Sequence, residues 1–277
     1  MLLEYKMFRI NCKLIILAAS VISVMLSSCG EYSKILKSKD QDFRYLSAKN
    51  YYNKGKFDKA FPLFEDVLAA WKGQEKSEEV YYYYCYTHYG MGNMNSASFH
   101  FKNFTETFFT SKKLEECAFM HAHAEYDMAL PHQLDQTQTY KAINELQLFI
   151  NMHPKSSFVD SSNTLMDNLR KQLITKDFNL AKLYFDRERY NSAIRSFENF
   201  LRDYPEIENR DEIEFFILRT NQKLAENSVE GKKLERWQKT EELAKLFALQ
   251  YGGNNKYMNK VKSILLLSQK KIKLIQK

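Results

Sequence analysis

The sequence predicts an all-α protein, a superhelix of about five helix–turn–helix repeats closed by a C-terminal capping helix. Only eight Gly and four Pro occur among the 277 residues, whereas folds rich in β-strands need these residues for many tight turns. The apolar fraction of 44% allows a sizeable core and excludes wholesale disorder. In addition, one pattern of small and aromatic residues recurs along the chain. Long helices joined by short loops are therefore expected.

The first 28 residues resemble a bacterial lipoprotein signal peptide. Lys6, Arg9 and Lys13 precede an apolar run of about 13 residues, whereas about 20 are needed to cross a bilayer. The run ends in Leu26-Ser27-Ser28-Cys29, which resembles a lipobox, the cleavage site whose cysteine receives a diacylglycerol. We therefore expect lipidation at Cys29 and no cofactor besides this covalent lipid. An ordinary signal peptide with an incidental cysteine is the alternative.

The residues after the lipobox indicate which membrane the chain reaches. Acyl chains on Cys29 would hold the mature chain on a bilayer without crossing it. Gly30 provides no acidic signal for retention in the inner membrane, and the segment Glu31–Lys34 lacks an acidic run for export to the cell surface. We expect the periplasmic face of the outer membrane, a tether over residues 29–40, and no nucleic-acid partner.

Four segments share the pattern that predicts the repeats. Each has a small residue where two helices would cross and a large apolar residue four positions later, and the last two are followed by Pro154 and Pro205. Antiparallel helices approach closely only over small side chains, large side chains fill the gaps beside them, and proline ends the second helix. The pattern resembles the tetratricopeptide repeat. The segments are Gly55–Phe64, Gly92–Phe101, Tyr140–Phe149 and Tyr190–Phe200, with the small residues Ala60, Ala97, Ala142 and Ala193.

The spacing of these alanines predicts how the repeats are grouped. The intervals are 37, 45 and 51 residues, all longer than the repeat unit of about 34. A polar stretch at residues 130–138 indicates a loop, and residues 158–173 continue a helical pattern without breakers. We expect three repeats in residues 41–157, and a linking long helix, a C-terminal repeat group and a basic capping helix in residues 158–277. A degenerate fifth helix pair ends at Gly252-Gly253.

A tyrosine-rich segment, Tyr81–Tyr89, is predicted to form the first helix of the second repeat and contains the candidate binding site. Helical spacing places Tyr84, Cys85 and His88 on the packing side and three other tyrosines on the side that lines the groove of this fold. Rings with hydroxyl tips suit extended peptides, because they grip apolar side chains and bond to the backbone. Packing against neighbouring repeats is the alternative. The candidate groove residues are Tyr45, Lys49, Tyr52, Tyr82, Tyr86 and Tyr89.

No catalytic set is recognisable, so we expect a protein that is not an enzyme and has no metal site. The sequence contains no phosphate-binding loop, dinucleotide-binding glycine run, His-Glu-x-x-His motif or nucleophile elbow. His121 and His123 fall on different sides of a helix. His121 and Glu125 are four residues apart and could share a cation, but a pair on the protein surface is the favoured interpretation. Cys85 and Cys117 are expected as small core residues, with a disulfide between them as the alternative.

Positive charge is concentrated at the C-terminus. Asn254–Lys277 contains seven Lys and no acidic residue. Such a tail could meet anionic headgroups or an acidic partner, or it could form the solvated face of a capping helix. The sequence leaves these interpretations open.

A lipobox followed by about five tetratricopeptide repeats resembles the BamD family, lipoproteins of the machinery that assembles β-barrels in the outer membrane. The resemblance covers the mature chain and is sharpest from Ala142 to Pro205. It implies that the N-terminal repeats receive unfolded outer-membrane proteins through aromatic-ended C-terminal signals. It also implies that the C-terminal repeats dock on the POTRA domains of a BamA-like β-barrel, with other assembly lipoproteins as further partners. The tyrosine-rich second repeat and the basic extension depart from the family.

The resemblance gives a cluster of arginines a candidate role. These arginines lie around the fourth repeat, in the half of the chain where the resemblance places the contact with the β-barrel component. Positive charges on a helical face could pair with an acidic POTRA surface. The candidate docking residues are Arg187, Arg189, Arg195 and Arg202.

Two other functions remain open at the level of sequence. One is a generic periplasmic repeat lipoprotein that scaffolds envelope complexes. The other is a glycan-binding lipoprotein of the SusD type, which is also built on these repeats. SusD-type chains are near twice this length and carry sugar-stacking tryptophans, whereas only Trp71 and Trp237 occur here.

Overall fold

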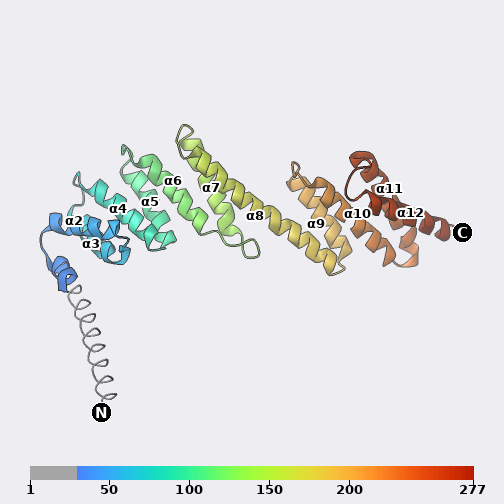
Figure 1. Cartoon of the computed structure of the whole chain (residues 1–277), viewed down its shortest axis with the longest axis horizontal. Coiled ribbons are helices and arrows are strands. Elements are labelled where there is room, and N and C mark those ends of the chain that lie inside the picture. The colour runs from blue at the N-terminus through green and yellow to red at the C-terminus, as the bar shows by residue number, and fades with distance from the viewer. Residues whose placement is uncertain (1–29) are drawn as a thin grey trace, which may run out of the picture. The chain divides into compact units, whose positions relative to one another are not determined.

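The structure, a computed structural model, describes residues 30–277, and every regular secondary-structure element among them is a helix (Figure 1). This confirms the predicted all-α fold class. The candidate lipidation site Cys29 lies outside the described residues. Between residues 30 and 277, no helix combines the length and the apolar character needed to cross a membrane. The helices are α2 (Gln41–Asn53), α3 (Phe57–Ala70), α4 (Ser77–Gly90), α5 (Met94–Thr107), α6 (Leu114–Asp127), α7 (Thr137–Met152), α8 (Val159–Asp186), α9 (Tyr190–Asp203), α10 (Arg210–Glu226), α11 (Glu230–Tyr251) and α12 (Met258–Ile275).

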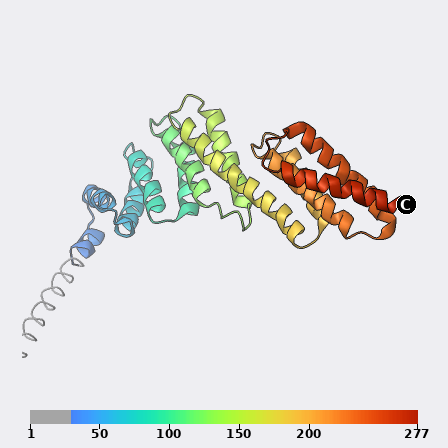
Figure 2. The ribbon, with the colours of Figure 1, turned by 45° about the vertical axis from the view of Figure 1, so that its right-hand side comes forward.

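Successive helices pack as pairs, which Figure 2 shows from a second direction. The pairs α2/α3, α4/α5, α6/α7, α8/α9 and α10/α11 form the repeats, and α12 follows against α11. The four small residues that predicted the repeats are completely buried, as a position between two crossing helices requires. These residues are Ala60, Ala97, Ala142 and Ala193.

The turn between the two helices of a pair has the same geometry in three repeats. Gly55 and Gly92 adopt left-handed backbone angles, with φ of 67° and 76°, at corresponding positions of the first two repeats. Glu188 occupies this position in the fourth repeat and has a φ of 58°. In each turn, the residue that follows this left-handed position donates its backbone N–H to the carbonyl of the residue five positions before the donor, at 2.9 or 3.0 Å. Because a side chain makes this conformation costly, Glu188 is a strained position.

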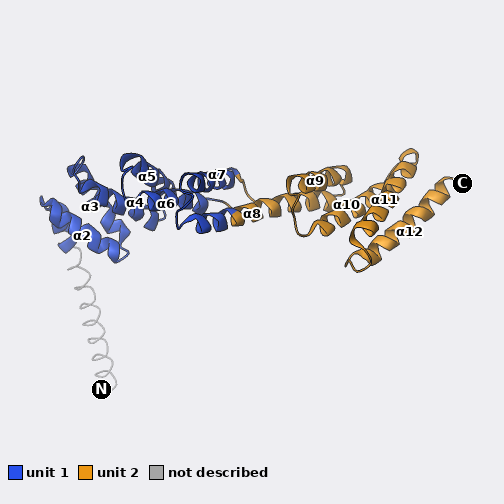
Figure 3. Cartoon of the chain, turned by 90° about the horizontal axis from the view of Figure 1, so that it is seen from above, with its two compact units in different colours: residues 1–129, 137–166 blue, residues 130–136, 167–277 orange. Residues whose placement is uncertain are grey.

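The chain divides into two compact units (Figure 3). The first contains the described residues up to 129 together with 137–166, and the second contains 130–136 and 167–277. The division therefore falls within α8, whereas the sequence placed it at residue 158, just before this helix. The predicted loop is observed at residues 129–136, and α7 begins directly after it.

Aromatic side chains form the core of the first unit. Phe64 of α3 and Tyr84 of α4 belong to a cluster that joins the first repeat to the second. Phe101 and Phe104 of α5 pack with Cys117 of α6 in a cluster that joins the second repeat to the third. Each cluster spans a repeat boundary, so neighbouring repeats stabilise one another.

The second unit is organised in the same way. Phe197 and Phe200 of α9 pack against Ile213 of α10. Phe247 of α11 packs with Val261 of α12 in a further cluster. The apolar side of α12 thus covers the last helix pair, which is the capping position that the sequence predicted.

Residues 30–37, which the sequence assigns to a tether, form a short helix packed against the first repeat. Ile35 enters the core cluster of that repeat. The Tyr32 hydroxyl donates a hydrogen bond to the Lys59 carbonyl at 3.1 Å, and its ring meets the edge of Tyr51 at 5.5 Å between centroids. The tether expected over residues 29–40 is therefore, at residues 30–37, a helix fixed to the first repeat.

Candidate functional site

The six candidate groove residues lie on the first helices of the first two repeats. Tyr45, Lys49 and Tyr52 belong to α2, and the other three belong to α4. All six side chains are partly buried, because each faces the first helix of the next repeat. We call this surface the first-helix face, and define it by Tyr45, Lys49, Tyr52, Tyr82, Tyr86 and Tyr89.

The α2 part of the first-helix face contacts α4 through one ion pair and several rings. Lys49 Nζ lies 3.0 Å from Glu79 Oε1 and 4.9 Å above the centre of the Tyr83 ring. The Tyr52 ring meets the edge of Tyr83 at 5.1 Å between centroids. The Tyr45 ring lies 5.4 Å from the Trp71 ring. Lys49 and Tyr52 thus both contact the Tyr83 ring.

Two tyrosines of the α4 part of the face share one carboxylate of α6. The hydroxyls of Tyr82 and Tyr86 both donate hydrogen bonds to Glu116 Oε1, at 2.7 and 2.5 Å. The two rings lie 4.8 Å apart, and the Tyr86 ring meets the edge of Phe101 at 5.0 Å. Lys113 Nζ sits 4.1 Å from the centre of the Tyr82 ring. Glu116 of α6 and Lys113, the residue just before α6, therefore frame these two tyrosines.

Tyr89 repeats this arrangement one turn further along α4. Its hydroxyl donates a hydrogen bond to Asp127 Oδ2 at 2.6 Å and lies 3.1 Å from His123 Nδ1. His123 and Asp127 are four residues apart on α6, and their side chains are also within 3.2 Å of each other. A tyrosine on one first helix bonding to a carboxylate on the next is thus a recurring contact of this face.

Burial and these carboxylates keep the tyrosine hydroxyls uncharged. Burial, followed by the hydrogen bond to Glu116, raises the pKa of both Tyr82 and Tyr86 well above the usual value. Burial and the bond to Asp127 do the same to the pKa of Tyr89. The face therefore offers neutral rings, part of whose surface is open, and fixed carboxylates beside them.

The structure differs from the sequence expectation in what the hydroxyls do. A groove lined with free hydroxyl tips was expected, but Tyr82, Tyr86 and Tyr89 already donate to carboxylates of the next repeat. These tyrosines therefore contribute to packing between repeats, while their partly exposed rings remain available for contact. Peptide binding by the face stays a prediction. The sequence analysis missed Glu116 and Tyr83, because nothing local to either residue shows which residues of another repeat lie opposite.

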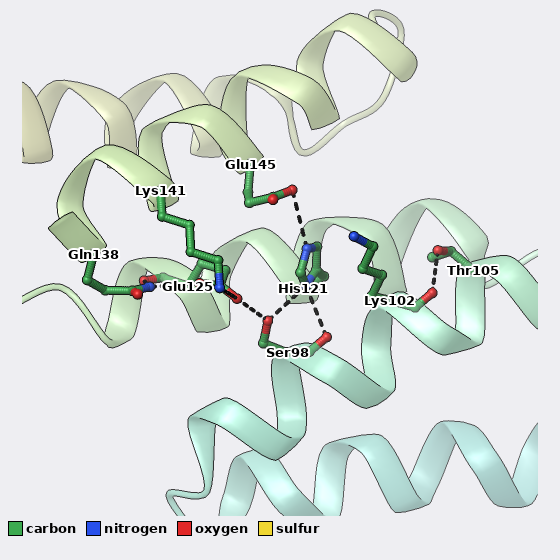
Figure 4. A network of polar contacts seen from close by, with 8 residues as sticks. All are labelled: Ser98, Lys102, Thr105, His121, Glu125, Gln138, Lys141 and Glu145. Atoms are coloured by element: carbon green, nitrogen blue, oxygen red, sulfur yellow. Dashed lines mark hydrogen bonds and ion pairs between the residues drawn. The ribbon is translucent and has the colours of Figure 1, made fainter.

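A buried polar network connects the second and third repeats beside this face (Figure 4). The Glu125 side chain on α6 is only 3% exposed. It accepts hydrogen bonds from the Ser98 hydroxyl, from Gln138 Nε2 at 2.7 Å and from Lys141 Nζ at 2.9 Å. Burial alone would raise the pKa of Glu125, but these three bonds outweigh it and lower the pKa. The carboxylate is thus held in its charged form.

His121 belongs to the same network and links it to α7. Its Nδ1 lies 2.9 Å from the Ser98 hydroxyl and 3.0 Å from the Ser98 carbonyl, and its Nε2 lies 3.3 Å from Glu145 Oε2 (Figure 4). The sequence favoured a surface pair of His121 and Glu125, and this interpretation is wrong because both side chains turn into the contact with α5 and α7. Within residues 30–277, no three potential metal ligands form a cluster.

The remaining candidate residues lie elsewhere. Cys85 and Cys117 are free, buried thiols, so the alternative of a disulfide is not observed. Burial is the main cause that raises the pKa of both thiols.

The candidate docking arginines lie in the second unit and are all exposed. Arg187 and Arg189 flank the strained turn between α8 and α9, while the other two lie on α9. Across the described part of the chain, Arg202 is the member of this group that forms an ion pair, with Asp203 at 3.1 Å. Arg187, Arg189 and Arg195 form no ion pair with any other residue in 30–277, and their role in docking stays a prediction.

Comparison with known proteins identifies a family. The YfiO family, described as an outer membrane lipoprotein family, matches residues 37–236. No curated protein sequence matches the chain. Among solved structures, the TPR2AB-domain–pHSP90 complex of yeast Sti1 has 12% identity and a TM-score of 0.40, covering 83% of this chain and 98% of that one. A tetratricopeptide repeat protein from Parabacteroides merdae has 11% identity and a TM-score of 0.36, covering 84% and 100%.

Proposed function

The chain belongs to the YfiO family of outer membrane lipoproteins, and from this membership we propose that it is a non-enzymatic adaptor of the machinery that assembles β-barrels. In this proposal the lipid on Cys29 holds the protein on the periplasmic face of the outer membrane. The N-terminal repeats bind unfolded segments of outer-membrane proteins. The C-terminal repeats dock on the POTRA domains of a BamA-like β-barrel component. The observation that carries the proposal is the family match, which spans residues 37–236 and therefore most of both repeat groups.

The chemistry of the first-helix face supports a role in binding unfolded chains. Partly open rings at Tyr45, Tyr52 and Tyr82 provide apolar contact area at low entropic cost. An extended peptide also needs hydrogen-bond acceptors for its N–H groups, and the Glu79 and Glu116 carboxylates lie beside these rings. Binding at this face is specific for extended, aromatic-rich segments in this proposal.

Charge on the same face supports recognition of a chain terminus. Lys49 Nζ lies over the Tyr45 and Tyr83 rings, and Lys113 Nζ lies over the Tyr82 ring. A peptide that ends in an aromatic residue carries its carboxylate next to that ring. A lysine that lies over an aromatic surface can donate hydrogen bonds to such a carboxylate, while the aromatic ring of the peptide packs on the same surface.

The test is copurification from solubilised outer membrane with a tagged, lipidated protein. We expect the β-barrel component to be recovered in constant ratio with the lipoprotein. We also expect depletion of the lipoprotein to lower the amount of folded outer-membrane β-barrels. Recovery of envelope proteins without a β-barrel component, with β-barrel levels unchanged on depletion, would instead identify a generic periplasmic scaffold.

A further inference from the structure

We propose that the first residues after the lipidation site form a surface that rests on the membrane, so that the first repeat lies against the bilayer. This membrane-contact patch is defined by residues of the 30–37 helix, the connection after it and the first turns of α2. The inference rests on the proposed lipidation of Cys29 and adds to it a protein surface that meets lipid. The members of the patch are Lys34, Leu36, Lys37, Lys39, Phe43 and Leu46.

The chain has no slack between the lipid and the first repeat. Gly30, the residue that follows Cys29 in the sequence, is helical. Ile35 and Tyr32 fix this helix to the first repeat through core packing and the bond to the Lys59 carbonyl. A residue spans at most ~3.6 Å, so the lipidated cysteine can lie no further than about that distance from a structured helix. A lipid inserted in the bilayer therefore brings the first repeat to its surface.

The helix of residues 30–37 presents lysines away from the first repeat. Lys34 and Lys37 are three residues apart, on the side of the helix that points away from its packed side. Both are exposed, and the exposed Lys39 follows them. Leu36 is 37% exposed at the edge of this side. Lysines combined with an apolar residue are the composition that binds anionic interfaces.

The exposed side of α2 changes from apolar to polar along its length. Phe43 is 47% exposed and Leu46 is 64% exposed, one turn apart near the start of the helix. Further along the same side of α2, the exposed residues are the polar Asn50 and Asn53. The apolar residues of this side therefore lie in the N-terminal half of α2, which is nearer in sequence to Cys29. Water is an unfavourable neighbour for Phe43 and Leu46, whereas the boundary between headgroups and acyl chains accommodates them.

The acidic residues nearby are largely engaged within the protein. Asp40 accepts the backbone N–H of Phe43 at 3.0 Å and caps α2. Asp42 pairs with Lys76 at 2.7 Å. Glu31 is the remaining acidic residue of this segment. Asp40 keeps its charge while it caps α2, so the three lysines of the patch exceed the unpaired carboxylates of Glu31 and Asp40 by one positive charge, which complements anionic phospholipid.

The experiment measures contact of Leu46 with lipid in the lipidated, mature protein. A Leu46→Cys variant carries an environment-sensitive fluorophore, and the protein is reconstituted into vesicles of phosphatidylethanolamine and phosphatidylglycerol with nitroxide-labelled acyl chains. Cys85 and Cys117 are buried, so labelling is selective for the introduced thiol. The matched control is Leu249→Cys, because Leu249 is a leucine with an exposed fraction of 84% in the second unit. We expect several-fold stronger quenching at position 46 than at position 249.

Two further variants test the two causes of contact separately. The triple variant Lys34→Glu/Lys37→Glu/Lys39→Glu is expected to reduce quenching at position 46 several-fold without releasing the protein from vesicles. A flexible Gly-Ser insertion of twenty residues between Cys29 and Gly30 is expected to reduce it as well. Equal quenching at positions 46 and 249 in protein that floats with vesicles would overturn the membrane-contact patch and leave the lipid anchor intact. Protein that fails to float would overturn the anchor itself. Crosslinking of position 46 to an acidic protein in native membranes, without lipid quenching, would assign the patch to that protein instead.

Discussion

Replacing Glu125 is expected to weaken the contact between the second and third repeats strongly. Glu125→Ala leaves the buried Ser98 hydroxyl without its charged acceptor, which costs ~1–3 kcal/mol, whereas Gln138 is only partly buried and keeps its bond to the backbone carbonyl of residue 125. The Lys141 side chain is 54% exposed and regains water, so its lost bond adds only ~0–1 kcal/mol. The expected loss in the free energy of unfolding is therefore ~1–4 kcal/mol.

The effect of acid gives this prediction a second, independent measurement. The pKa of Glu125 is lowered in the folded protein, so its carboxylate contributes stability above the unfolded-state value of about 4.5. That contribution is lost as the pH falls through the lower, folded-state pKa. In Glu125→Gln this part of the acid sensitivity is absent, because the amide does not titrate in this range. The stability of the wild type should therefore fall more steeply below pH ~4.5 than that of the variant.

The assay is urea unfolding followed by helical circular dichroism, with the unlipidated chain that carries Cys29→Ala. The matched control is Glu115→Ala, because Glu115 is an exposed glutamate in the first turn of the same helix. Its substitution should change the free energy of unfolding by no more than ~0.5 kcal/mol. A Glu125→Ala variant as stable as Glu115→Ala, or parallel acid profiles for the wild type and Glu125→Gln, would refute the reasoning.

Three further outcomes follow from the turns, the helix contacts and the exposed arginines. Glu188→Gly should raise the free energy of unfolding by ~1 kcal/mol, because glycine adopts the left-handed angle without strain; an equal gain from Glu188→Ala would show that the backbone is not the cause. Gly90→Ala should lower the free energy of unfolding by ~1–3 kcal/mol, because the added Cβ would lie 2.5 Å from the Phe57 ring. Gly231→Ala, whose Cβ would meet open space, is the control in the same unfolding assay. Arg195→Glu should lower recovery of the β-barrel component in copurification with helical content unchanged, and full recovery after reversing all four candidate arginines would exclude this group.

The fold could be predicted from the sequence because its strongest signals are local. Ala60 and Ala193 must be small wherever two helices cross, and the residue four positions later must be large, so each repeat carries its own signature. The burial of both alanines confirms this. The helix of residues 30–37 was not predicted, because it is held by contacts of Tyr32 and Ile35 with the first repeat rather than by a pattern of its own.

The candidate site could be predicted only in part. Helical spacing placed Tyr82 and Tyr86 together on one side of α4, and the structure brings them to one carboxylate. That carboxylate, Glu116, lies thirty or more residues away in sequence, where no local pattern identifies it. The same limit explains Glu125. Charged side chains usually lie on the surface, and only the approach of Ser98 from another helix shows that Glu125 is buried.

The most direct test of the central claim is photocrosslinking from the first-helix face during the assembly of outer-membrane proteins. A photoreactive phenylalanine analogue replaces Tyr82, a partly buried ring of this face on α4, and a second protein carries it at Phe99, which is exposed on α5. The account predicts that position 82 captures newly made, unfolded outer-membrane proteins with an aromatic C-terminus and that position 99 captures few of them. Equal capture at both positions, or capture at 99 alone, would contradict the claim that the first-helix face receives these substrates.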